Sequence, residues 1–410
     1  MDDDVADHSI AQLVGHESAV HSVALHPVDP DIVATGSEDD TAALWRCAEG
    51  KKIAELKGHT DTIVQVAFNF DGSLLATAGM DGVLNVWNTA DGTLVQALDG
   101  PGAELNWLAW HPRGNVVVAG SADFSVWVWM LPAGNMLQCL TGHGGDVTCG
   151  GFSADGRHII SADANANLRV WNPRDGGTVI NVSPGELHRE AILCMDLSET
   201  NLVLTGSADG TAKLTTLNFA TTPPVAKTVA TCAGHTDTIE AVALSKRLGL
   251  IATACVDKLV RVFEIDRPDI VRCTCPHDAP VVAVAFRPNT DHVVSTGVDR
   301  SVRVWEAKSG ASISTLTGHR DGVRSPLLSC TISLDPHITT PPHPHPSHTS
   351  TPLTHHPLLR RAEWCRCCVW LYLPTGVAPL RGVTIPPVSF LISLPSEWHR
   401  TTYTLDEMQK

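Results

Sequence analysis

The feature that most constrains the fold is a tryptophan that returns every 42 residues. Trp45, Trp87, Trp129 and Trp171 follow one another at this spacing, and Trp305 lies in the same sequence surroundings. A repeat of roughly 40–45 residues with about four short strands is typical of a β-propeller blade. The period therefore predicts an all-β chain in which each repeat forms one sheet of a ring.

Polar residues recur in the same register. A histidine stands 21 to 23 residues before a short polar residue, a hydroxyl stands four residues before it, and the tryptophan follows it by six. The four fullest sets are His16, Thr35, Asp39 and Trp45; His59, Thr77, Asp81 and Trp87; His143, Ser161, Asn165 and Trp171; and His277, Ser295, Asp299 and Trp305. The indole can donate to the hydroxyl, the hydroxyl to the imidazole and the imidazole to the carboxylate, so that each buried donor finds an acceptor. We interpret these residues as a structural relay, not as a catalytic or metal-binding set.

Three repeats depart from the full pattern. Unit 3 has Pro101 and Ala119 in place of the histidine and the hydroxyl, while units 5 and 6 have Thr215 and Phe263 in place of the tryptophan. We expect these units to depend more on apolar packing.

Short alternating or apolar stretches between the markers predict the strands. They cover residues 19–25, 62–68, 105–110, 146–152 and 281–286, with an outer strand at 311–317 and an N-terminal strand at 9–14. The predicted organisation is an acidic tail (1–8), a β-propeller (9–324) with seven recognisable units and a truncated eighth that starts at His319, and a C-terminal tail (325–410).

The C-terminal tail contrasts with the repeats. It holds 13 of the 26 prolines of the chain, and proline cannot donate to a sheet ladder. We therefore expect a largely unstructured tail, an N-terminal strand without neighbours, and open sheet edges prone to aggregation. The histidines and cysteines of the tail match no zinc-site spacing, so we expect no metal and no cofactor.

The amino-acid composition limits the kind of partner that the chain can bind. The formal net charge is −15, and residues 1–324 carry 39 acidic against 23 basic residues. This balance argues against direct nucleic-acid binding and favours a basic protein partner. The acidic N-terminus and the prolines of the tail predict neither a secretory signal nor a membrane span. We expect the protein to be a monomer and to lie in the cytoplasm, with the nucleus as a second location.

Acidic residues next to the histidines and the relay carboxylates form a candidate partner-binding face. They are Glu17, Glu38, Asp40, Asp61, Glu104, Asp146, Asp163, Glu190, Asp237 and Asp278. The functional interpretation is an acidic funnel for an Arg/Lys-rich segment. The alternative is that each acid is ordinary repeat sequence and only solvates a loop.

Unit 3 adds two candidate aromatic contacts, Trp107 and Trp127. Exposed tryptophans are frequent anchors of protein interfaces. The alternative is that they fill the space left by the missing histidine of this unit.

The repeat pattern resembles the WD40 family from residue 9 to about residue 324. The stretch 104–113, followed by 118–123 and 127–129, is similar to the family of angio-associated migratory cell protein and its fungal ribosomal-protein chaperone counterparts. That resemblance implies an eight-bladed propeller that binds and protects a basic segment of a large-subunit ribosomal protein.

No motif outside the repeat register indicates catalysis, so we expect no enzyme. The leading hypothesis is a dedicated chaperone or assembly factor for a ribosomal protein. The alternatives are a WD40 adaptor in signalling or cell migration and the substrate receptor of a ubiquitin ligase, because fold alone does not fix function.

Overall fold

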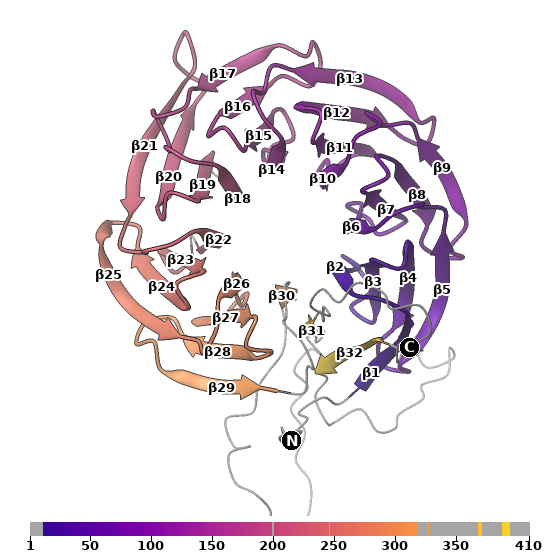
Figure 1. The fold of residues 1–410 in the computed structure, drawn as a ribbon. Helices are drawn as coiled ribbons and strands as arrows, with labels where there is room; N and C mark the ends of the chain where they lie inside the picture. The colour runs from indigo at the N-terminus through magenta and orange to yellow at the C-terminus, as the bar shows by residue number, and fades with distance from the viewer. Residues whose placement is uncertain are drawn as a thin grey trace, which may run out of the picture.

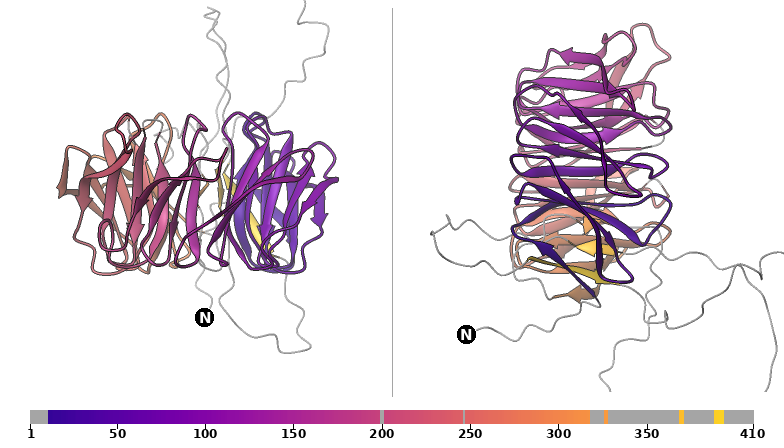
Figure 2. Two further views of the ribbon diagram at one scale, coloured as in Figure 1. Left: turned by 90° about the horizontal axis from the view of Figure 1, so that it is seen from above. Right: turned by 90° about the vertical axis from the view of Figure 1, so that its right-hand side faces the viewer.

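The computed structural model describes residues 11–198, 201–245 and 247–317 and, beyond them, three short strands. All described elements are strands, arranged as eight four-stranded antiparallel sheets around one axis (Figure 1). Seen from the side, the ring is a disc, and the loops between strands form its two faces (Figure 2). The described part of the chain holds no helix with the length and apolar character needed to cross a bilayer.

Seven sheets, here called blades 1 to 7, each take four consecutive strands, with the first strand innermost. Blades 1 to 4 consist of β2 (Val20–Leu25), β3 (Ile32–Ser37), β4 (Thr41–Arg46) and β5 (Lys51–Lys57); β6 (Ile63–Phe68), β7 (Leu74–Gly79), β8 (Leu84–Asn88) and β9 (Leu94–Leu98); β10 (Leu105–Trp110), β11 (Val116–Ser121), β12 (Ser125–Met130) and β13 (Asn135–Thr141); and β14 (Val147–Phe152), β15 (Ile159–Asp163), β16 (Leu168–Trp171) and β17 (Thr178–Val182). Blades 5 to 7 consist of β18 (Ile192–Leu197), β19 (Leu202–Ser207), β20 (Ala212–Asn218) and β21 (Val225–Cys232); β22 (Ile239–Ser245), β23 (Leu250–Cys255), β24 (Leu259–Glu264) and β25 (Arg267–Pro276); and β26 (Val281–Phe286), β27 (His292–Gly297), β28 (Val302–Glu306) and β29 (Ser312–Leu316).

The inner strands lie where the sequence predicts them. The five expected inner strands agree with β2, β6, β10, β14 and β26 to within one residue at each end. β29 likewise forms the outer strand of blade 7, as expected. Alternation of apolar side chains is thus sufficient to locate the strands of this repeat.

The eighth sheet corrects one expectation. β1 (Ala11–His16) has a neighbour: it pairs with β32 (Val388–Ser393), which is followed inward by β31 (Cys368–Trp370) and β30 (Pro326–Leu327). We predicted an N-terminal strand without a partner, because prolines dominate the tail; the segment 388–393 is free of proline and can form a ladder. The eighth blade is nevertheless short, with two and three residues in β30 and β31. The predicted lack of structure in the rest of the tail, and the tail 1–8, lie outside the described residues.

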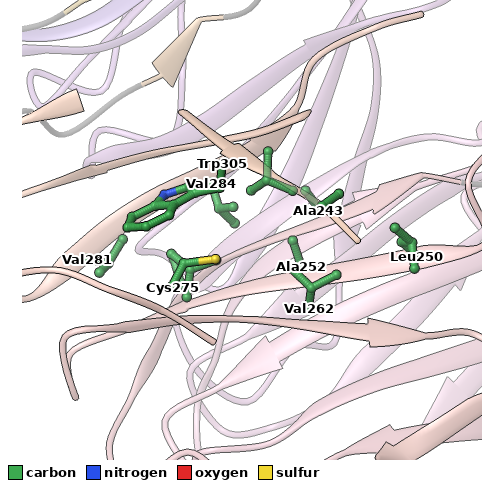
Figure 3. Packing of buried hydrophobic residues seen from close by; sticks show 12 residues of the cluster. Ala243, Leu250, Ala252, Val262, Cys275, Val281, Val284 and Trp305 are labelled. Carbon is green, nitrogen blue, oxygen red and sulfur yellow. The ribbon is translucent and has the colours of Figure 1, made fainter. Parts of the chain in front are cut away.

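Apolar side chains fill the space between neighbouring sheets. Between blades 6 and 7, Val281, Val284 and Trp305 lie against Ala252 and Val262 (Figure 3). Similar apolar clusters lie between blades 1 and 2, 2 and 3, 3 and 4, 4 and 5, and 5 and 6. Burial of apolar surface between sheets is the main stabilising contribution in such a ring.

Side chains also tie the inner strands together. The hydroxyl of Ser22 accepts a hydrogen bond from Val66 N at 3.0 Å, and Gln65 Oε1 accepts one from Leu108 N at 3.0 Å. The inner edge of each sheet has free backbone groups, so these side chains satisfy donors that no further strand can reach. They hold adjacent blades in a fixed register.

Candidate interaction face

The relay forms as predicted in most blades. In six of the seven, a histidine Nδ1 lies 2.8–3.1 Å from a carboxylate oxygen, and its Nε2 lies 2.7–2.9 Å from a hydroxyl. Where tryptophan is present, its indole N–H donates to the same hydroxyl at 2.7–3.0 Å. The residues are His16, Thr35, Asp39 and Trp45; His59, Thr77, Asp81 and Trp87; His143, Ser161 and Trp171; His188, Thr205 and Asp209; His235, Thr253 and Asp257; and His277, Ser295, Asp299 and Trp305. These side chains are used internally, which supports the structural interpretation.

Blade 4 corrects the predicted register. The carboxylate that meets His143 belongs to Asp163, not to the position occupied by Asn165. Asp163 is fully buried and accepts hydrogen bonds from Gly144 N and from the backbone and side chain of Asn167. Burial alone would raise the pKa of Asp163, but the hydrogen bonds from His143 and Asn167 bring it below its ordinary value. Asp163 is therefore part of the core and does not belong to the acidic face.

Blade 6 contains a group with metal-ligand chemistry. The side-chain donor atoms of His235, Cys255 and Asp257 lie within 4.8 Å of one another. Cys255 occupies the place of Ser37 and donates to Asp237 O as Ser37 donates to Ala19 O. Burial raises the pKa of Cys255 to about 12, so the thiol stays protonated at neutral pH. The hydrogen bonds of this group explain its geometry without a metal.

Histidines that are buried or partly buried make stability depend on pH. Burial is the main cause that lowers the pKa of six histidines below the ordinary value of 6.5: His26, His111, His158, His188, His235 and His292. The unfolded chain then binds more protons than the folded chain as the pH falls through this range. We expect the urea midpoint of unfolding to decrease from pH 7.5 to pH 5.5, before the relay carboxylates titrate. An equal or higher midpoint at pH 5.5 would contradict this assignment.

The histidine loops and the carboxylate turns meet on one face of each blade. Asp39 Oδ2 accepts from Glu17 N at 2.8 Å, and Asp81 Oδ2 accepts from Thr60 N at 2.9 Å. The same bond from the residue after the histidine recurs in blades 4 to 7. All these loops therefore belong to one face of the disc, here called the relay face.

The acids of the relay face are concentrated on one side of the ring. Those of blades 1 to 4 are solvent-accessible apart from Asp163: Glu17, Glu38, Asp40, Asp61, Glu104 and Asp146, joined by Asp99 and Asp123. In blades 5 to 7 the exposed acids Glu190, Asp237 and Asp278 alternate with exposed Arg189, Lys258 and Arg300. Arg303 also contacts Asp278 directly. A cationic ligand would therefore be attracted chiefly to blades 1 to 4, and the expected complete acidic ring is reduced to this half.

Mutual repulsion is already visible where blades 1 and 2 meet. The pKa of Asp40 is raised, first by burial and then by the negative charges of Asp61, Asp39 and Asp81. A bound cation would relieve this repulsion, because an opposite charge within a few ångströms favours the ionised carboxylate.

The two candidate tryptophans of blade 3 differ in accessibility. Trp107 is 5% exposed and belongs to the core between blades 3 and 4, so the packing alternative holds for it and it cannot act as a surface anchor. Trp127 is partly buried; its indole N–H donates to Ser125 Oγ at 2.6 Å, and its ring stacks on Trp129. Trp127 remains a candidate contact. Sequence reasoning missed its neighbour Phe124, which is 44% exposed.

Two glycines make room for Trp107. A Cβ on Gly120 would lie 2.0 Å from Trp107 Nε1, and one on Gly150 would lie 2.4 Å from the same indole ring. We expect Gly120→Ala to destabilise the chain by about 1–3 kcal/mol, the usual cost of overpacking a core. Chemical denaturation of the purified variant measures this difference. A variant as stable as the parent would show that the indole can move aside.

Comparison with known proteins now places the chain in a family. The profile of the WD domain, G-beta repeat family matches residues 8–46, 50–88, 92–130, 134–172, 226–264 and 270–306. These segments make up more than half of the chain, which therefore belongs to the WD repeat family. Blade 5 falls largely outside the matched segments, although it has the same four strands and keeps the histidine, hydroxyl and carboxylate of the relay.

Particular relatives are similar over different lengths. An uncharacterised WD repeat-containing protein of Schizosaccharomyces pombe is 36% identical over 346 residues, which are 82% of this chain and 84% of that protein. Human angio-associated migratory cell protein is 36% identical over 59 residues, or 14% of each chain. The structure is similar to that of Chaetomium thermophilum Sqt1 bound to the N-terminus of the ribosomal protein L10, with a TM-score of 0.71 and 25% identity, covering 78% of this chain and 94% of that chain.

Proposed function

We propose that this chain is a non-catalytic interaction scaffold that acts as a dedicated chaperone for a large-subunit ribosomal protein by binding a basic segment of it. The observation that carries the proposal is the likeness to Sqt1 in complex with the N-terminus of L10. The likeness extends over nearly the whole of Sqt1, so it concerns the complete ring and not a single repeat.

The charge of the relay face supports a basic ligand. The accessible acids of blades 1 to 4 face one side of the disc, and a focused negative potential raises the association rate of a cationic segment. The same potential disfavours nucleic acid, whose phosphates are repelled. We place the protein in the cytoplasm, where it would meet newly made ribosomal proteins, with a nuclear pool as a further proposal, and we propose that it acts as a monomer.

Isothermal titration of the full chain with a synthetic peptide tests the proposal. The probe is the N-terminal peptide of Chaetomium thermophilum L10, and the control is the same peptide with every Arg and Lys replaced by Gln. We expect saturable binding of the first peptide alone, with an affinity that falls as salt rises. No binding at low salt, or equal binding of both peptides, would refute a basic ribosomal ligand.

Affinity purification of the tagged full chain separates this proposal from its alternatives. A chaperone should copurify with one ribosomal protein in near-stoichiometric amount. Recovery of signalling or cytoskeletal proteins would favour an adaptor, a role suggested by the short match to angio-associated migratory cell protein. Recovery of ubiquitin-ligase subunits would favour a substrate receptor.

A further inference from the structure

Blade 3 has a relay carboxylate without its usual donors. In six blades one carboxylate oxygen accepts both from the histidine and from the backbone N–H of the next residue. In blade 3, among the described residues, Asp123 Oδ2 has only a 3.4 Å contact with Trp127 Nε1. Its Oδ1 is held by Ser125 N at 2.9 Å, so the carboxylate is oriented while one oxygen stays open to solvent.

Blade 7 shows that a guanidinium can bond a relay carboxylate in addition to the usual donors. Arg303 precedes Trp305 by two residues, and its Nη2 contacts both Asp278 of the loop and Asp299 of the turn, the latter at 3.1 Å. The corresponding residue of blade 3 is Trp127, which carries no charge. Blade 3 thus keeps the turn carboxylate, Asp123, and a loop acid, Glu104, without an internal guanidinium.

An exposed aromatic ring borders this open carboxylate. Phe124 follows Asp123 directly, has a φ of 71° and is 44% exposed. The same turn position has a positive φ in all seven blades, and Phe124 is the one aromatic residue there; the others are Asp40, Gly82, Ala166, Gly210, Lys258 and Arg300. A bulky residue is unfavourable there, and its exposed ring contributes little to the core. The backbone of Glu104 lies beside this turn, because its carbonyl accepts from Ala122 N at 2.9 Å, and its side chain is exposed.

We propose that Asp123, Phe124, Trp127 and Glu104 form a binding site for an arginine side chain of the partner. The guanidinium would pair with Asp123 Oδ2 and Glu104, as Arg303 pairs with two acids in blade 7, and would lie on the ring of Phe124. Arginine suits this site better than lysine because its planar fork can bond two acceptors and stack on an aromatic ring at once. The identity of the partner rests on the proposed function. The preference of the site for an arginine side chain does not depend on that function.

Binding of nona-arginine and nona-lysine peptides to the full chain at one fixed salt concentration tests the site. We expect the parent to bind nona-arginine about fivefold more tightly, in line with one cation–π contact and one ion pair. Asp123→Asn and Phe124→Gly should each reduce this preference at least by half. Glu49→Gln removes the same charge from an exposed loop of the opposite face and should leave this preference unchanged. Phe124→Gly should melt no lower than the parent, because glycine suits a positive φ.

The outcomes separate the site from the proposed function. A parent without preference for arginine, or variants that keep it, overturns the site, even if the L10 peptide binds. An arginine preference that both variants lose establishes the site, even if the L10 peptide fails to bind and the proposed function falls. Cys139, an exposed thiol paired in register with Trp127, gives a second readout. Nona-arginine should slow its alkylation in the parent and not in Asp123→Asn.

Discussion

Asp163→Ala should destabilise the chain by about 3–5 kcal/mol, because several hydrogen-bond donors lose their acceptor at once and each buried donor left unsatisfied costs about 1–3 kcal/mol. The substitution leaves His143 Nδ1, Gly144 N and the Asn167 side chain without their shared acceptor. The His143 ring cannot easily replace this acceptor with water, because Asp163 and the His143 side chain are fully buried. Urea unfolding at pH 7.5, followed by tryptophan fluorescence, measures the loss.

Asn165→Ala is the matched control for this result. Asn165 occupies the position that carries the relay carboxylate in the other blades, but its side chain is exposed where it donates to Gly144 O. We expect a loss of less than about 1 kcal/mol, in the range of a single exposed hydrogen bond. If Asn165→Ala proved the more damaging change, the assignment of Asp163 to the relay would be wrong.

Reversing three acids of the relay face should slow the association of a basic ligand by about a hundredfold at low salt, within the range known for electrostatic steering. The variant is Glu17→Lys, Glu38→Lys and Asp61→Lys combined. All three side chains are exposed and lie in blades 1 and 2, where burial and then the charges of Asp61 and of the relay acids raise the pKa of Asp40. Stopped-flow mixing with the fluorescently labelled L10 peptide measures the rate.

A triple variant on the opposite face controls for net charge. Glu49, Asp91 and Asp175 are exposed acids in the loops that follow β4, β8 and β16, away from the relay turns. Their replacement by lysine changes the total charge by the same amount, and we expect less than about a threefold effect on the association rate. Equal slowing in both triple variants would mean that only net charge matters and that the ligand has no preferred face.

The sequence was sufficient to predict whatever depends on a repeated local pattern. The spacing of His16, Thr35, Asp39 and Trp45 could be read in one repeat and checked in others, and the structure confirms the hydrogen bonds that it predicts. Inner strands could be placed because alternating apolar residues must face the neighbouring sheets. Because the residue pattern recurs along the chain, the prediction made from one repeat could be checked in the others.

The features that the sequence did not predict depend on how residues of different strands and repeats pack together in space. Asp163 and Asn165 are two residues apart, and only the packed blade shows which of them reaches His143. For Trp107 the sequence offered both a surface contact and core packing, and the glycines on β11 and β14, which leave room for its ring, agree with packing. The pairing of β1 with β32 joins residues at opposite ends of the chain, which no local pattern specifies.

The charge distribution of the relay face was only half predicted. Every blade contributes an acid there, as the repeat implies, but Arg189, Lys258 and Arg300 are neighbours of these acids in blades 5 to 7. The exposure of Phe124 was missed because its signal is a phenylalanine at a turn position where the other repeats have small or charged residues. That signal becomes informative only once the turn is known to have a positive φ.

Hydrogen exchange of the full chain with and without the L10 N-terminal peptide tests most directly whether the acidic half of the relay face is the binding surface. We predict slower exchange in the turns at residues 37–41 and 121–125 and in the loop at 58–62, with no change in the opposite loop at 69–73. Protection confined to the opposite face, or to blades 5 to 7, would contradict the binding surface proposed for this propeller.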